Sequence, residues 1–288
     1  MAQFTIKTPK KFLEVRVKIA ETLPSLLGLC AGYESGEWRC EQLAGHLMEW
    51  LPEFALTERE RAGIGSDNLV AMAAKAARAI YASRDIKRRG EIGEILLHAI
   101  IRQEYNSVPA ISKIYFKDSE NDTVKGFDAV HVVKGDSTFD LWLGESKFYK
   151  DIASAINAVV SELNDHTENK YLRSEFTAIL NKIDPTWPFA DELMKLIDRN
   201  RSLDEIFDSL CFPVFLTYES ETISSHESVS DDFLKEIEDE LVNNHSTFCK
   251  KDLPSDIVIH LLLLPLENKQ KLVEAFDERL KACQIIAN

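Results

Sequence analysis

Three residues of this sequence, Asp128, Glu145 and Lys147, have side-chain types and spacing suited to catalysis. Glu145 and Lys147 lie two positions apart in residues 138–149, a stretch rich in aromatic and branched side chains that predicts a β-strand. Successive side chains of a strand point to opposite faces, so Glu145 and Lys147 should project from the same face. An acid and a lysine that project together can act on one substrate group.

Asp128 belongs to an earlier predicted strand, residues 126–133, and a turn signal at 134–137 separates this strand from the next. The midpoint of positions 128 and 145 falls inside that turn, between Asp136 and Ser137. A regular antiparallel hairpin would therefore place Asp128 directly opposite Glu145, with the Cβ atoms about 4.5–5.5 Å apart.

Two opposed carboxylates repel each other unless something offsets their charge. Mg²⁺, with Mn²⁺ as an alternative, fits this requirement, because hard cations bind carboxylates, carbonyl groups and phosphate oxygens. The carbonyl oxygen of Ser146 is a further candidate ligand, and Lys147 could orient a water molecule or stabilise charge on a phosphate. These residues predict metal-assisted hydrolysis of a phosphodiester. The residues alone leave open that they are ordinary surface side chains on a half-exposed strand.

Helices and strands alternate around this hairpin. Residues 37–51, up to Pro52, and a second stretch from Ser66 through 71–82 predict helices. Further expected elements are a helix at 88–104, a strand at 111–116, a helix at 152–163, a strand at 212–218, a helix at 231–242, a strand at 257–266 and a helix at 268–283. This order predicts an α/β (mixed α+β) fold in which helices flank a central mixed sheet. We expect a helical N-terminal subdomain at 1–85 and a second domain at 86–288.

A helix that carries a glutamate, then strands with an Asp and an E-x-K, then another helix resembles the PD-(D/E)xK, restriction-endonuclease-like nucleases. The resemblance implies a restriction-endonuclease-like core and a helix carboxylate at the same metal site. Glu94 is the better match, and Glu91 is the alternative. His98 is more readily explained by packing or hydrogen bonding than by catalysis. The sequence has Phe127-Asp128 where the usual motif is Pro-Asp, a common departure.

The segments RGEIGEILLHAI, GFDAVHVV and LWLGESKFYKD resemble HamA, the nuclease family of the Hachiman anti-phage defence system. This resemblance implies a metal-dependent DNA endonuclease that acts with a HamB-like helicase on aberrant DNA. Two alternatives remain open: a non-catalytic adaptor on a nuclease-like fold that binds and regulates a helicase, and a stand-alone restriction or repair nuclease. No added DNA-reading module is visible, which weighs against the last.

The charge of the chain bears on its partners. The formal net charge is −14. Residues 1–90 carry 14 basic and 11 acidic side chains, and the remainder carries 20 basic and 37 acidic ones. Tight DNA binding by such a chain alone is not expected, because phosphate neutralisation supplies most non-specific affinity. One dense basic cluster is present: Arg84, Lys87, Arg88 and Arg89.

The remaining composition is that of an ordinary globular protein, with 45% hydrophobic and 28% charged residues. The five cysteines are scattered without a CxxC pair, which favours small buried residues in a reduced compartment. Residues 1–11 contain no apolar segment typical of a secretory signal, and the longest apolar run, 257–266, is too short to span a bilayer. We therefore expect a cytoplasmic protein without a membrane partner.

Overall fold

The computed structural model describes residues 8–80, 90–111, 126–135, 138–255 and 257–286. The strands of this part of the chain are β1 (Glu14–Ile19), β2 (Ser25–Cys30), β3 (Tyr33–Glu34), β4 (Glu37–Trp38), β5 (Val108–Ile111), β6 (Ala129–Lys134), β7 (Phe139–Phe148), β8 (Leu210–Glu219) and β9 (Val258–Leu266). The helices are α1 (Cys40–Ala55), α2 (Glu58–Ala62), α3 (Leu69–Ile80), α4 (Glu91–Glu104), α5 (Ile152–His166), α6 (Asn169–Lys182), α7 (Ala190–Leu196), α8 (Leu203–Phe207), α9 (Glu221–Ser225), α10 (Asp231–Cys249) and α11 (Lys269–Ile286).

A mixed seven-stranded sheet with the order β1-β2-β9-β8-β7-β6-β5 forms the centre of the molecule. The middle pairings β2–β9, β9–β8 and β8–β7 are parallel, whereas β1–β2, β7–β6 and β6–β5 at the two sides are antiparallel. Strands β8 and β9 are buried along almost their whole length, as expected for parallel strands covered on both faces.

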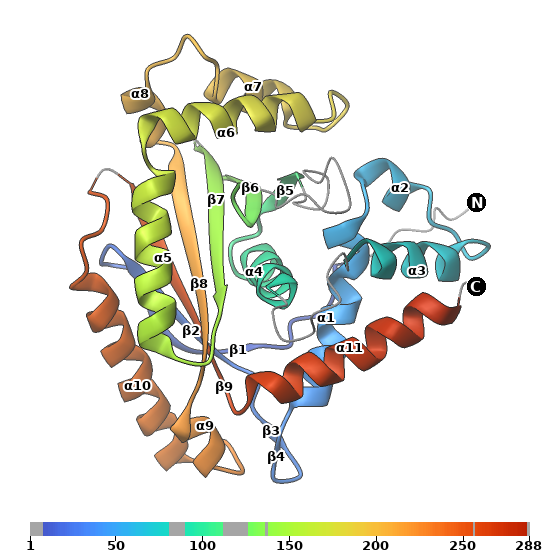
Figure 1. Ribbon diagram of the computed structural model, residues 1–288, viewed down its shortest axis with the longest axis vertical. Helices are drawn as coiled ribbons and strands as arrows, with labels where there is room; N and C mark the ends of the chain where they lie inside the picture. Colours follow the sequence, from blue (N-terminus) through green and yellow to red (C-terminus); the bar gives the residue numbers. More distant parts are fainter. Residues whose placement is uncertain (1–7, 81–89, 112–125, 136–137, 256, 287–288) are drawn as a thin grey trace.

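Helices cover both faces of this sheet, as Figure 1 shows. Helices α5 and α10 lie on one face, and α5 contacts β7 and β8. Helix α4 lies on the other face against β6, β7 and β8, and α1, α3 and α11 pack beyond it. The predicted α/β fold with a central mixed sheet and flanking helices is confirmed.

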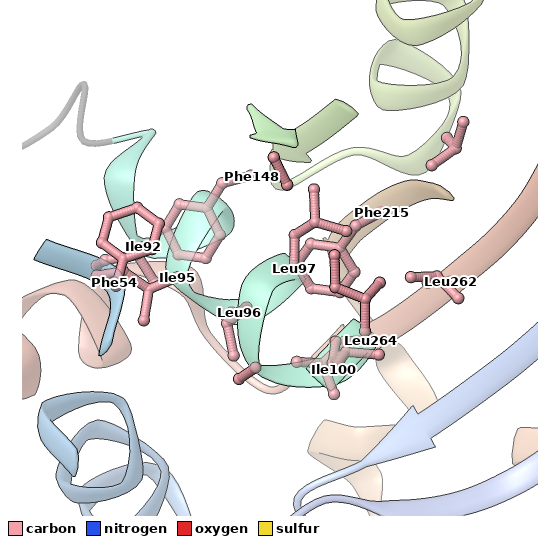
Figure 2. Packing of buried hydrophobic residues seen from close by; sticks show 14 of the residues in the cluster. Phe54, Ile92, Ile95, Leu96, Leu97, Ile100, Phe148, Phe215, Leu262 and Leu264 are labelled. Atoms are coloured by element: carbon pink, nitrogen blue, oxygen red, sulfur yellow. The ribbon is translucent and has the colours of Figure 1, made fainter. Parts of the chain in front are cut away.

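Helix α4 is the central helix of the core. Its apolar side chains recur at helical spacing, and nine of its residues are buried. In Figure 2 its side chains pack in one cluster with aromatic and branched residues of β7, β8 and β9, including Phe148, Phe215 and Leu264. The helix is therefore fixed against the strands that carry the candidate site.

The N-terminal part of the chain differs from the expected helical segment. Helices α1 and α3 are present there, but the same segment supplies β1 and β2 to the main sheet. All six residues of β2 are buried, so the strand lacks the alternation of polar and apolar residues that reveals a strand in a sequence. Helix α1 also continues beyond Pro52 to Ala55: proline lacks only its own N–H, and its carbonyl still accepts a hydrogen bond from the N–H of Leu56.

Some predictions fall outside the described residues. The expected domain boundary after residue 85, the basic cluster Arg84, Lys87, Arg88 and Arg89, and most of the strand expected at 111–116 lie there. The division into domains 1–85 and 86–288 therefore stays a prediction. Among the helices of the described ranges, none combines the length and the apolar character needed to cross a membrane.

Candidate active site

The hairpin β6–β7 has the register that the sequence predicted. Ala129 pairs with Gly144, and every further pair along β6 keeps the same midpoint. The backbone N–H of Asp128 donates to the carbonyl of Gly144 at 2.8 Å. Asp128 and Glu145 are the next residues along the two strands and lie close together, but they are not a pair of the ladder, so the predicted direct opposition is not observed.

Beyond this point β7 continues without β6, and the Asp128 side chain takes the place of a backbone partner. Its Oδ2 accepts hydrogen bonds from the backbone N–H of Ser146 and from the Ser146 hydroxyl, both at 2.8 Å. Two such bonds fix the carboxylate at the edge of β7. From the sequence, only the carbonyl oxygen of Ser146 was a candidate ligand. In the structure, the N–H and the hydroxyl of Ser146 hold the Asp128 carboxylate in place.

The two faces of β7 present different side chains. On one face, Ser146 and Phe148 lie against Gly93 of α4, where an added Cβ would come within 3.1 Å of Phe148. On the other face, Glu145 and Lys147 meet α5: Glu145 contacts His166, and Lys147 contacts Glu162. This alternation confirms that Glu145 and Lys147 share a face.

Glu145 is a buried acid, only 2% exposed. Its Oε1 lies 2.6 Å from Nδ1 of His166. Burial raises the pKa of Glu145 to about 7, and the nearby charge of Asp128 adds to this effect although the hydrogen bond with His166 opposes it. The carboxyl group is therefore ready to exchange a proton near neutral pH.

Lys147 remains positively charged at this site. Burial alone would lower its pKa, but the hydrogen bond with Glu162 and the charge of Glu145 outweigh burial, and the pKa is raised. Burial would also lower the pKa of His166, but the hydrogen bond with Glu145 outweighs burial, and the pKa of His166 is raised.

A cavity of about 430 Å³ opens beside these residues. Glu94, Asp128 and Lys147 line it together with Gly90, Ser146, Phe148, Tyr149 and Lys269. Of the two helix glutamates that the sequence left open, Glu94 lines the cavity, whereas Glu91 is not among the described residues of its wall. Glu145 lies behind this wall, on the α5 side of β7.

These donors suit a hard divalent cation. Within the described ranges, no three His, Cys, Asp or Glu side chains form a ready-made metal cage. Mg²⁺ does not require one, because it keeps several waters and usually binds through one or two carboxylates. Two carboxylates, Glu94 and Asp128, line the cavity, and Glu145 adjoins Asp128. The chemistry of this donor set therefore fits the cation that the sequence predicts.

The match to known proteins extends over nearly the whole chain. The model of the HamA family matches residues 8–280. The chain belongs to the HamA family. It is also 24% identical over 257 residues to a protein of Escherichia coli (strain K12) named Anti-bacteriophage protein A. That match covers 86% of this chain and 46% of the relative, so the chain spans less than half the length of the relative.

His98 of this HamA family chain lies in a buried network on α4. It is 3% exposed, and its Nδ1 lies 3.1 Å from Nε2 of His131. Its Nε2 lies 3.3 Å from the carboxylate of Glu53 on α1. His98 does not line the cavity. These contacts are packing and hydrogen bonding, the explanation that the sequence favoured.

Three residues at the site were not found by reading the sequence. Glu162 and His166 are one helical turn apart on the helix that follows the E-x-K strand, and this spacing was a usable signal. Lys269 lies at the start of α11, far along the chain, and no sequence pattern connects it with the motif. Its Nζ donates to the carbonyl of Phe148 at 2.5 Å and adds a second cation to the cavity wall.

Proposed function

We propose that this chain is a metal-dependent DNA endonuclease that serves anti-phage defence. The observation that carries the proposal is the shared cavity wall of Glu94, Asp128 and the charged Lys147, next to which the β6–β7 hairpin holds Glu145. Membership of the HamA family and the name of the Escherichia coli relative, Anti-bacteriophage protein A, support the defence role.

The proposed metal ligands are Asp128, Glu145, Glu94 and the carbonyl oxygen of Ser146, with Mg²⁺ as the cation and Mn²⁺ as an alternative. When bound, such a cation lowers the pKa of a water molecule and offsets the negative charge of the phosphodiester. The fixed carboxylate of Asp128 is held for this task by the two hydrogen bonds from Ser146.

Lysine side chains complete the proposed site. Lys147, whose pKa is raised, keeps its positive charge and stabilises negative charge on the phosphate. Lys269, which also lines the cavity, offers a second positive group to the DNA backbone. Burial lowers the pKa of Lys269, and the nearby charge of Lys150 acts in the same direction.

The proposed partner is a HamB-like helicase that senses or delivers aberrant DNA. A chain with a net charge of −14 lacks the excess of basic residues that holds DNA without help. A helicase that supplies this affinity would restrict cleavage to the DNA that it presents.

The test is cleavage of plasmid and linear DNA with Mg²⁺ by the wild type and by Lys147→Ala, each alone and with the partner helicase and ATP. We expect Lys147→Ala to lower the rate by at least about 100-fold, because it removes the charge that stabilises the phosphate. Lys195→Ala on α7 is the matched control, since Lys195 is not among the described residues that line the cavity. Absence of cleavage in every condition, with partner binding retained by the variant, would favour the non-catalytic adaptor.

A further inference from the structure

Helix α5 lies along the strand that carries the E-x-K motif, and it contacts both charged residues of that motif. His166 contacts Glu145, and Glu162 contacts Lys147. We propose that His166 and Glu162 are positioning residues: His166 fixes the carboxyl group of Glu145 for the cation, and Glu162 fixes the ammonium group of Lys147 for the phosphate. This inference rests on the proposed nuclease function.

The spacing of the two pairs supports a joint role. Glu162 and His166 are four residues apart on a helix, a rise of about 6 Å. Glu145 and Lys147 are two residues apart on a strand, a distance of about 6.6 Å. The later residue of the helix meets the earlier residue of the strand, which is the arrangement of a helix that returns antiparallel to the strand before it. One helix therefore reaches both members of the motif at matching intervals.

His166 is itself held in place. Its ring stacks on Tyr171 with centroids 4.2 Å apart and planes 11° apart, and the ring of Phe127 packs edge-on at 5.3 Å. Phe127 directly precedes Asp128, so the same short segment supports the histidine and supplies a proposed ligand. A ring fixed on two sides suits a positioning group better than a mobile one.

The contact of His166 leaves the carboxyl group of Glu145 able to bind a cation. Nδ1 of His166 contacts Oε1, and a carboxylate has two oxygens, so Oε2 can serve as the ligand while Oε1 keeps its partner. Hydrogen-bond partners of metal-binding carboxylates fix their orientation, and the loss of such a partner typically costs about 10- to 100-fold in metal affinity or activity.

The first experiment measures Mn²⁺ binding to the full chain without DNA, by electron paramagnetic resonance or calorimetry. We expect His166→Ala to weaken binding about 10- to 100-fold. His166→Asn should restore much of the affinity, because the Asn amide can donate a hydrogen bond from about the position of Nδ1. The control is His226→Ala, which removes a histidine paired with Glu236, 3.0 Å away at the surface. Equal or tighter Mn²⁺ binding by His166→Ala would overturn the proposal.

Glu162 is tested by separating metal binding from turnover. We expect Glu162→Gln to leave Mn²⁺ affinity within about twofold of the wild type and to lower kcat about tenfold, since Lys147 loses the partner that holds it. Asp165→Asn makes the same charge change at an exposed position of α5 and should match the wild type in both measurements. An unchanged kcat for Glu162→Gln would overturn the role of Glu162.

Failure of this proposal can be told from failure of the nuclease proposal by including Glu145→Gln. If Glu145→Gln abolishes Mn²⁺ binding but His166→Ala binds as the wild type does, the site exists and only the positioning role is overturned. If the wild type and Glu145→Gln both fail to bind Mn²⁺, the metal site is disproved and the positioning role falls with it.

Discussion

Glu145 combines almost complete burial with a proposed role, metal binding, that requires charge. An acid in this setting holds its proton to about neutral pH unless a positive group joins it, and such perturbed acids concentrate at functional sites. The nearby charges of Lys147 and His166 lower the cost of ionising it, and a divalent cation would lower this cost further. Because burial makes the ionised form of Glu145 costly, a bound cation would stabilise that form strongly.

Cation binding should therefore depend on pH. A cation that binds Glu145 must displace the proton of a group whose pKa is about 7, so affinity should rise as the pH increases toward 7 and level off above it. Below pH 7 the expected slope is up to about tenfold per pH unit, because one proton is released. Mn²⁺ titrations at pH 5.5, 6.5, 7.5 and 8.5 measure it. Affinity that is constant between pH 5.5 and 7.5 would contradict a raised pKa at a ligand.

The two glutamates of the first turn of α4 should respond differently to the same substitution. Glu94 lines the cavity, and Glu91 is not among the described residues of its wall. We expect Glu94→Gln to weaken Mn²⁺ binding and DNA cleavage at least about tenfold and Glu91→Gln to change both less than about twofold. Each variant loses one negative charge from the same helix, so each controls for the other. The reverse order of effects would transfer the helix carboxylate to Glu91.

The sequence predicts which candidate residues lie close together wherever that depends on local structure. Asp128, Glu145 and Lys147 lie within one hairpin, so the strand period and the turn position predict which of them are neighbours. Contacts made by other elements could not be predicted in this way. The approach of Lys269 depends on how β9 and α11 pack, and no local pattern encodes that packing.

At the scale of elements, the closeness of α4 and β7 depends on small residues. A Cβ at Gly144 would come within 2.9 Å of Leu97 on α4, 3.1 Å of Ala129 and 3.3 Å of Pro213. Three neighbours crowd this position from a helix and two strands, so a side chain there requires Leu97, Ala129 or Pro213 to shift. This glycine lets the helix that carries Glu94 approach the strand that carries Glu145.

Gly144→Ala should therefore lower the free energy of unfolding by about 1–3 kcal/mol, the usual cost of overpacking. Gly45→Ala in α1 is the matched control, since its Cβ would meet nothing closer than Arg279 at 4.0 Å. There the better helix propensity of alanine should raise stability by about 0.5–1 kcal/mol. Urea unfolding followed by circular dichroism measures both. A Gly144→Ala variant as stable as the wild type would show that α4 can shift without cost.

The elements themselves were predictable to different degrees. Amphipathic helices such as α5 and α10 and the hairpin β6–β7 follow directly from periodicity and turn residues. Strand β2 does not, because burial on both faces removes the alternation that marks a strand. The alternation in residues 14–19 is too weak to tell a strand from a short helix, and only the pairing of β1 with β2 decides between them.

At the scale of the whole molecule, charge governs association with DNA. We expect the isolated chain to bind a 30-base-pair duplex with a Kd no tighter than about 10⁻⁴ M at physiological salt, the weak end of non-specific binding. Addition of the partner helicase should tighten binding. Fluorescence anisotropy of labelled DNA across a salt series measures both. Strong, salt-sensitive binding by the chain alone would contradict a dependence on the partner.

The position of β9 has a consequence for how the protein is made. It follows the other described strands in the sequence, yet it lies between β2 and β8 in the sheet. While residues 258–266 remain inside the ribosome, the hairpin β1–β2 has no strand to join and β8 exposes an unpaired edge. The sheet can close only after β9 has emerged. A nascent chain therefore carries its E-x-K strand in an open sheet, and the cavity wall that includes Lys269 of α11 can be completed only afterwards.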